Sequence, residues 1–290
     1  VALIHQSQSA PPVTIRQGAH PAYVAALWRE FQAPVLVLTP RAEDARRLYD
    51  HLLTYLDEDS PAYLLPETEV LPFERLAVDS HTGNQRLAAM AALASANNIG
   101  GNSEGRGSIP PLVVASIGAA LRLTLPPEVL ASDSNGAVVV GQRVRINELL
   151  SQWVQLGYRN EVLVESPGCF SQRGGIVDVF PSDAVSPFRI ELFDDQVDTI
   201  RHFDPYTQRS VKDAKSVSLI PAKEQLPKMA SRQRVEELIA QLDFSRCNSQ
   251  TRERFEDELV SLFSDSNNET LAFYNGLLNH SSLLDYLPQS

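Results

Sequence analysis

The sequence predicts a mixed α/β protein in which a parallel sheet covered by helices gives way to an antiparallel β module. Three observations support this fold class. Short apolar runs alternate with helical patterns over the first 140 residues, which is typical of a parallel sheet. From Gly157 to Ile220, apolar residues alternate at period two between turn residues, as they do in antiparallel strands. After Pro221 the helical spacing returns.

The first buried strand is expected at 35–38, where an apolar run lies between two prolines. Thr39 suits the N-cap of the helix that follows, and Pro40 suits its first position. The apolar residues of this helix recur at Ala45, Leu48, Leu52 and Leu56. The remaining elements of this sheet are two strands, at 62–65 and 112–115, and a helix near 85–94.

The segment 97–111 is rich in Gly, Asn and Ser, and we expect it to be a surface loop. A strand at 138–140 then leads to a helix that Asn147 can cap. Gly157 ends this helix, because glycine adopts a left-handed conformation there at little cost. The buried face of the helix carries Leu149, Leu150, Trp153 and Val154. Two further helices carry apolar stripes at 235–242 and 255–263.

Composition limits the classes of function. The net charge of −11 works against broad, non-specific binding to nucleic acid, which depends on neutralising phosphates. Cys169 and Cys247 are too few for a disulfide framework, which indicates a reducing compartment, and we expect a cytoplasmic protein. No run approaches the 18 apolar residues of a membrane span, so no membrane partner is expected. The chain starts without Met and ends in a partly apolar stretch, and we interpret it as part of a longer protein.

Lysine is missing from the first 211 residues. A phosphate-loop nucleotide site needs a lysine after a glycine-rich turn, and the segment 16–20, where such a loop would lie, has only Gly18. The six histidines are scattered, and Asp194-Asp195 is interpreted as a hairpin tip rather than a metal site. We therefore expect no cofactor, no metal and no catalytic residue.

The strand at 188–193 predicts a surface for a protein partner. Arg189, Glu191 and Phe193 share one face of this strand, a combination that protein-docking surfaces offer. Arg173 precedes a Gly-Gly pair that demands a tight turn or a bulge, and Arg159 can join the same surface. The alternative is an ordinary solvated face on which each arginine pairs locally, with Glu161, Glu165 or Glu191. Exposed pairs of that kind contribute about 0–1 kcal/mol.

Several motifs occur in order: GYR (157–159), VESPGCFSQRGGIVDVFP (164–181), PFRIELFDD (187–195), IRHFD (200–204) and TQRS (207–210). In this order they resemble the bacterial transcription-repair coupling factor family, Mfd. LPETEVLPFERL (65–76) is similar to a W-E-x-L-P-Y-E segment of that family, without its tryptophan. LLDYLP (283–288) is similar to the point where the family's N-terminal module nears its last strands. The resemblance covers most of the chain.

The resemblance implies a degenerate RecA-like, P-loop-type α/β domain in two segments, with a small antiparallel β-rich α+β domain inserted between them. The first segment is expected at 1–140 and the inserted UvrA-binding adaptor domain at 141–220. The helical second segment, cut short at its end, is expected at 221–290.

In this family the adaptor domain recruits UvrA to RNA polymerase stalled at a DNA lesion, in nucleotide excision repair. The related protein UvrB uses the corresponding surface for the same partner. The resemblance places its contact residues on Arg159, Arg173, Arg189 and Glu191, and Phe193 extends this candidate set. One UvrB contact arginine falls on Ser171, which departs from the pattern.

The leading interpretation is a non-catalytic module that binds UvrA. The resemblance implies that the parent protein is an ATP-dependent DNA translocase, which contacts RNA polymerase only through parts that this chain lacks. An alternative is a UvrB-type ATP-dependent repair helicase or nuclease subunit, which would need an intact phosphate loop and an aromatic-rich hairpin. A third is a DNA-binding domain, which the acidic balance disfavours because we expect no strong DNA binding by this chain.

We predict that the chain neither binds nor hydrolyses ATP, because the first 211 residues contain no lysine that could reach the terminal phosphates. Calorimetry with a non-hydrolysable ATP analogue and an assay of phosphate release both test this. Micromolar binding of the analogue would contradict it.

Overall fold

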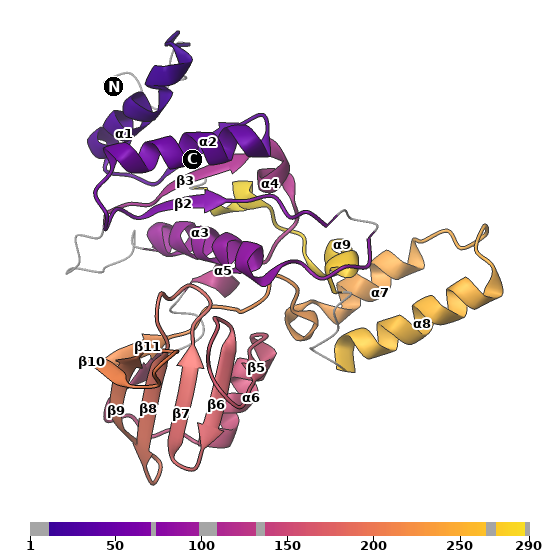
Figure 1. Cartoon of the computed structure of the whole chain (residues 1–290). Helices are drawn as coiled ribbons and strands as arrows, with labels where there is room; N and C mark the ends of the chain where they lie inside the picture. Colours follow the sequence, from indigo (N-terminus) through magenta and orange to yellow (C-terminus); the bar gives the residue numbers. More distant parts are fainter. Residues whose placement is uncertain (1–11, 71–73, 99–108, 132–136, 265–270, 288–290) are drawn as a thin grey trace.

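The computed structural model describes residues 12–70, 74–98, 109–131, 137–264 and 271–287. An α/β body built on a three-stranded sheet occupies the upper part of Figure 1, and a β module with a six-stranded sheet lies below it. The helices α7 and α8 form an arm beside the body. Among the described residues, no helix is long and apolar enough to cross a membrane.

The sheet of the body is parallel and consists of β1 (Val35–Thr39), β2 (Ala62–Leu65) and β3 (Leu112–Ser116). The strand order β1-β3-β2 puts β3 in the centre, where every one of its residues is buried. All three strands expected from the apolar runs are confirmed. The parallel direction follows from the helical connections, because antiparallel neighbours need only a short turn.

Two layers of helices bury the two faces of this sheet. The helices α1 (His20–Phe31) and α2 (Ala42–Leu52) pack on one face, against Leu112 and Val114. The long helix α3 (Ser80–Asn98) packs on the other face, against Val113 and Ala115. The shorter helical elements of the body are η2 (Gln17–Ala19), η3 (Leu53–Tyr55), α4 (Ile117–Leu121) and α5 (Pro127–Leu130).

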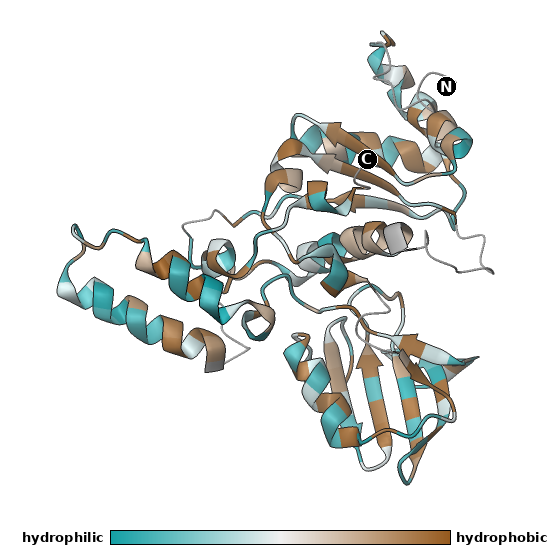
Figure 2. Cartoon of the chain, turned by 180° about the vertical axis from the view of Figure 1, so that it is seen from behind, coloured by the Kyte–Doolittle hydropathy of each residue, from teal (hydrophilic) through white to brown (hydrophobic). Residues whose placement is uncertain are grey.

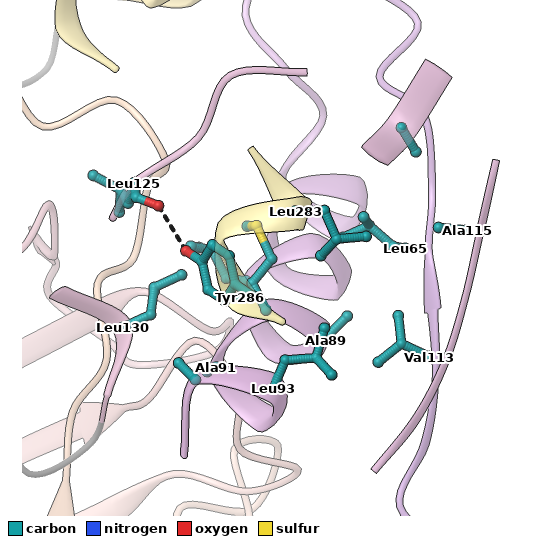
Figure 3. Close-up of a cluster of buried hydrophobic side chains, with 14 of the residues drawn as sticks. Leu65, Ala89, Ala91, Leu93, Val113, Ala115, Leu125, Leu130, Leu283 and Tyr286 are labelled. Atoms are coloured by element: carbon teal, nitrogen blue, oxygen red, sulfur yellow. Dashed lines mark hydrogen bonds between the residues drawn. The ribbon is translucent and has the colours of Figure 1, made fainter. Parts of the chain in front are cut away.

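The end of the described chain returns to the core formed by its first part. Leu283 and Tyr286, from the 3-10 turn η7 (Leu283–Tyr286), lie among side chains of α3, and the Tyr286 hydroxyl donates to the Leu125 carbonyl at 2.7 Å (Figure 3). One hydrophobic core therefore joins residues about 160 positions apart in the sequence.

The β module contains a six-stranded sheet in the order β10-β9-β8-β7-β6-β5. Only the short pair β5–β6 is parallel. Its strands are β5 (Arg159–Asn160), β6 (Cys169–Arg173), β7 (Ile176–Phe180), β8 (Phe188–Phe193), β9 (Gln196–Phe203) and β10 (Ser210–Ala214). The pair β4 (Ala137–Val139) and β11 (Ser216–Ser218) brings the two ends of the module together.

The helix α6 (Ile146–Gln155) covers one face of this six-stranded sheet. Trp153 meets Phe170 edge to face, with ring centroids 5.8 Å apart, in a core that also contains Val177 and Ile190. Gly157 follows the helix with φ +89°, which confirms the expected glycine stop. The antiparallel module inserted in the chain is thus present.

Both predicted N-caps are wrong, and so is the placement of Pro40 at the first position of its helix. The helix α2 begins at Ala42 after an extended Arg41, and the Thr39 hydroxyl donates to the Arg41 carbonyl at 2.9 Å instead of capping. The helix α6 begins at Ile146, so Asn147 lies inside its first turn. In both cases local preference favours the predicted residue, but the N-cap lies two residues away from it, at Arg41 and at Arg145.

The part of the chain after the β module is helical, as expected. The helices α7 (Arg232–Ala240) and α8 (Ser249–Ser264) turn apolar and hydrophilic residues to different sides (Figure 2). Leu262 packs with Leu271, Tyr274 and Leu278. The remaining elements are η5 (Pro227–Met229), η6 (Leu271–Tyr274) and α9 (Asn275–Leu278). In the predicted loop 97–111, residues 99–108 lie outside the described part of the chain.

A buried polar network joins the three parts of the chain. Arg86 of α3 donates to both carboxylate oxygens of Glu224, at 2.5 and 3.2 Å, and both side chains are almost fully buried. The Thr124 hydroxyl donates to the same carboxylate at 3.0 Å. From the end of the chain, the Asn279 amide donates to the Glu224 backbone carbonyl at 2.9 Å. Glu224 follows directly on the β module, so the network fixes where the module leaves the body.

We predict that Arg86→Met destabilises the protein by about 3–5 kcal/mol, because Glu224 would remain buried without its cation. Urea unfolding followed by circular dichroism measures this loss. The control is Arg145→Met, the same substitution at a side chain that is 81% exposed, and it should cost less than about 0.5 kcal/mol. Equal stability of the two variants would show that the buried pair does not hold the parts together.

Candidate protein-docking face

The β module has one face that α6 leaves uncovered. Phe170, Val177 and Ile190 point toward α6, so the residues that alternate with them point the other way. The strand register aligns these alternate residues into two rows across the sheet. One row is Ser171, Asp178, Arg189 and Arg201, and the other is Arg173, Ile176, Glu191 and Thr199. We call this surface the outer face.

The structure brings the five predicted site residues to this outer face or its border. Arg159 pairs with Cys169 at the β5 edge, and Phe193 lies at the end of β8, where it is 80% exposed. Arg173, Arg189 and Glu191 occupy the two rows. Period-two alternation on 188–193 was sufficient to predict that Arg189, Glu191 and Phe193 share a face, but it says nothing of Arg159 and Arg173.

Arg173 is a predicted cation that is exposed to solvent. It ends β6 and pairs with Ile176, which leaves Gly174 and Gly175 as the two residues of the turn. Gly174 has φ +61°, and a Cβ on Gly175 would lie 2.9 Å from the Leu192 carbonyl oxygen, so both positions require glycine. The exposed guanidinium donates to the Val162 carbonyl at 3.2 Å. The predicted tight turn is confirmed.

Arg189 is held in place rather than carried outward. Its guanidinium donates to both carboxylate oxygens of Asp178, at 2.7 and 2.8 Å, and to the Gln208 carbonyl at 3.2 Å. It also lies over the Phe203 ring, 4.8 Å from the centroid. Hydrogen bonding to Asp178 raises the pKa of Arg189. The side chain is 19% exposed, so it offers a partner only part of its surface.

Arg159 and Glu191 have weaker local partners. The Arg159 guanidinium lies 3.9 Å from the Glu161 carboxylate and 3.5 Å from the Cys169 sulfur. Glu191 accepts a hydrogen bond from the Thr199 hydroxyl at 3.0 Å. Local pairing is therefore real for Arg159, although an exposed pair at this distance contributes little. Both side chains remain accessible to a partner, with 45% and 34% exposure.

Sequence reasoning missed several residues of the outer face. Arg201 lies 3.8 Å from Glu191 and 3.3 Å from Asp213, so it adds a cation to the first row. Ile176 and Val162 add exposed apolar surface beside Arg173. Alternation along β9 could have identified Arg201. Val162 follows β5 in a loop, and the sequence carries no signal for its position.

The described residues contain no group of three His, Cys, Asp or Glu side chains that could hold a metal ion. A cavity of about 640 Å³ lies where a phosphate loop would be expected, at the start of α1. Gly18 and His20 line it from one side, and Arg47 and His51 line it from α2. Its lining residues within the described chain include no lysine to reach a terminal phosphate.

We predict that Arg189→Ala lowers the free energy of unfolding by about 3 kcal/mol, because Asp178 would stay buried without its cation. Arg173→Ala, the matched control on the neighbouring row, should change it by less than about 0.5 kcal/mol. Denaturant unfolding of the two variants tests the difference, and an Arg189→Ala protein as stable as wild type would contradict it.

Residues 137–224 match the family model of the UvrB interaction domain. The chain is also similar to proteins named transcription-repair-coupling factor. It is 34% identical over 206 residues to that of Bacillus subtilis (strain 168), and 34% identical over 218 residues to that of Myxococcus xanthus. The protein of Staphylococcus haemolyticus (strain JCSC1435) is 32% identical over 199 residues.

These matches cover 69–73% of this chain but only 16–17% of the relatives. The chain therefore spans about one sixth of the length of the curated relatives it matches. The antiparallel module and the family match occupy the same stretch, from β4 to just beyond β11. The chain thus contains a UvrB interaction domain and is homologous to the N-terminal part of the transcription-repair-coupling factors, Mfd.

Proposed function

We propose that this chain is a non-catalytic interaction module of a transcription-repair coupling factor, and that its β module recruits UvrA to RNA polymerase stalled at a DNA lesion. The observation that carries the proposal is the outer face. It gathers charged and apolar groups on a sheet whose other side is closed by α6. The match to a UvrB interaction domain over the same residues supports it.

The body serves this proposal as a scaffold. We propose that it is a degenerate RecA-like domain made of residues 1–140 and 221–290, with the adaptor at 141–220. The parallel sheet supports this, and so does the return of Leu283 and Tyr286 to the core of the first segment. The cavity at the phosphate-loop position is lined by no lysine among the described residues. This favours a body that supports the β module over one that hydrolyses a nucleotide.

Arg173 is the residue on which docking should depend most. Its guanidinium is exposed, its one described hydrogen bond is to a carbonyl, and the hairpin turn beside it requires glycine at both positions. Arginine at such a position can donate two hydrogen bonds to a carboxylate of the partner. Val162 and Ile176 next to it, and Phe193 at the end of β8, supply apolar area that docking would remove from water.

Arg189 has a different part in this surface. Arg189 already donates two hydrogen bonds to Asp178. It would therefore hold the strands of the outer face in register, and would offer the partner only the part of its guanidinium that is exposed. Glu191 would accept a hydrogen bond from a donor group of the partner, and the hydrogen bond from Thr199 would fix the rotamer of Glu191. The two rows then offer both signs of charge within a few residues, which favours one orientation of the partner over others.

We predict that Arg173→Ala weakens UvrA binding more than any other single arginine change, by about 2–5 kcal/mol, or roughly 30-fold and more. Calorimetry or biosensor titration with UvrA of the same organism measures the affinity. Arg159→Ala, Arg189→Ala and Phe193→Ala complete the series, with Arg145→Ala as the exposed control.

The melting temperature of each variant is measured beside its affinity. Arg173→Ala should melt like wild type, whereas Arg189→Ala should lose both stability and binding. If Arg173→Ala binds UvrA as tightly as Arg145→Ala does, or binds less only because it unfolds, the outer face is not the docking surface.

A further inference from the structure

Arg159 lies at the border of the outer face, where the β module meets the body. Its strand β5 has two residues and forms one edge of the six-stranded sheet. Arg159 lines the same cavity as Gly168 and the residues 222–225 that lead out of the module. Arg173, by contrast, ends β6 four residues beyond Cys169, the register partner of Arg159, which is about 13 Å along the strand.

Two consecutive residues at the start of β6 hold Arg159 in place. The Arg159 amide donates to the Gly168 carbonyl at 3.0 Å, and its guanidinium donates to the Cys169 sulfur at 3.5 Å. The hydrogen bond to Cys169 raises the pKa of Arg159. The Glu161 carboxylate, 3.9 Å away and exposed, adds little. Because β5 has a sheet neighbour on one side only, the position of Arg159 depends on where Gly168 and Cys169 lie.

Residues 222–226, which we call the exit segment, lead from the module back to the body. The Ala222 amide donates to the Leu156 carbonyl at 2.8 Å, at the end of α6. Glu224 of the same segment forms the buried ion pair with Arg86 of the body. The exit segment is therefore attached to the module at Ala222 and to the body at Glu224.

Two glycines of the module make room for the exit segment. Gly168 has φ +83°, and a Cβ on it would lie 3.3 Å from the Ala222 Cβ. Gly157 has φ +89°, and a Cβ on it would lie 3.1 Å from Leu226 Cδ2 and 3.3 Å from the Lys223 Cβ. Carbon atoms in ordinary contact are about 3.5–4.0 Å apart, so a side chain at either glycine would displace the exit segment or the loop that faces it.

We propose that the exit segment positions Arg159 for UvrA through its contact with Gly168. Gly168 is a positioning residue, because its carbonyl fixes the Arg159 backbone and its missing Cβ lets the exit segment approach. Since Glu224 anchors the exit segment in the body, docking through Arg159 depends on how the module is seated on the body, whereas docking through Arg173 does not. This role of Gly168 rests on the proposed docking of UvrA at the outer face.

The experiment measures UvrA affinity by calorimetry, and the melting temperature, on variants of the whole chain. Arg159→Ala should weaken binding about 10-fold, the effect of losing one charge-assisted hydrogen bond. Gly168→Ala should weaken binding about 3- to 10-fold, because it can cost no more than the contact of Arg159 itself. Adding Ala222→Gly to Gly168→Ala removes the atom that the new Cβ meets, and should restore affinity to within about 2-fold of wild type.

Gly141→Ala is the matched control for backbone strain. Gly141 has φ +88°, close to that of Gly168, but a Cβ there would meet no atom within 4 Å. Both glycine variants should melt a few degrees below wild type, since a side chain disfavours the left-handed conformation. Of the two, only Gly168→Ala should lose affinity for UvrA.

A double-mutant cycle shows whether the loss acts through Arg159. Combined with Arg159→Ala, Gly168→Ala should weaken binding no further, to within about 2-fold. Combined with Arg173→Ala, it should add its full effect, because Gly168 and Arg173 flank opposite ends of β6.

The positioning role is overturned, and the docking face left intact, if Arg173→Ala weakens binding but Arg159→Ala does not. It is also overturned if Arg159→Ala weakens binding while Gly168→Ala binds like Gly141→Ala. An equal loss from Gly168→Ala with and without Arg159, or no recovery with Ala222→Gly, has the same meaning.

A failure of the proposed function looks different, because Arg159→Ala and Arg173→Ala would then both bind UvrA like the exposed control Arg145→Ala. Should Gly168→Ala fail to fold, Ala222→Val crowds the same contact from the exit segment. Its affinity should then fall only when Arg159 is present, and unchanged affinity in this variant rejects the positioning role.

Discussion

The buried pair of Arg86 and Glu224 is the interaction on which the arrangement of this molecule depends. It joins α3 to the first residues after the β module, and Asn279 attaches the end of the chain to the same point. Removing two charged groups from water costs free energy, so a buried ion pair needs further hydrogen bonds. Here the Thr124 hydroxyl donates to Glu224, and the Pro66 carbonyl accepts from Arg86. Because the pairing is directional, it fixes the path by which the chain leaves and re-enters the body.

The β module divides its two faces between different tasks. The face toward α6 is apolar and gives the module its own core, around Trp153 and Phe170. The outer face is mixed: Phe180 and Phe203 are buried there with Val164, and the pair of Asp178 and Arg189 supports the sheet itself. Exposed groups and supporting groups thus stand side by side on the same face. Their roles can be told apart only by their exposure and their partners.

Sequence patterns predicted the elements well and their connections poorly. The apolar runs at 35–38 and 112–115 were enough to predict two strands. The run at 112–115 is fully buried as expected, but the one at 35–38 is only half-buried and exposes Leu38, because β1 lies at the edge of the sheet. The same alternation assigned Arg189 to the outer face, but it could not show Asp178 as its partner. That pairing depends on the register between β7 and β8, which no local pattern encodes. The pair of Arg86 and Glu224 is harder still to predict, because its two residues are 138 positions apart in the sequence. Thr39 and Asn147 show a different error. Both residues have a strong local preference for the N-cap, but each helix starts at another residue.

The return of Leu283 and Tyr286 to the first core has a consequence for how the chain folds during synthesis. The pairing of β4 with β11 and the core on α6 need only residues between 137 and 222, so the β module can fold soon after these leave the ribosome. The body cannot close until residue 286 is available, because Tyr286 binds Leu125 across 161 positions. Until then α3 keeps an apolar flank open to solvent. The β module can thus fold before the body, whose core waits for contacts between residues far apart in the sequence.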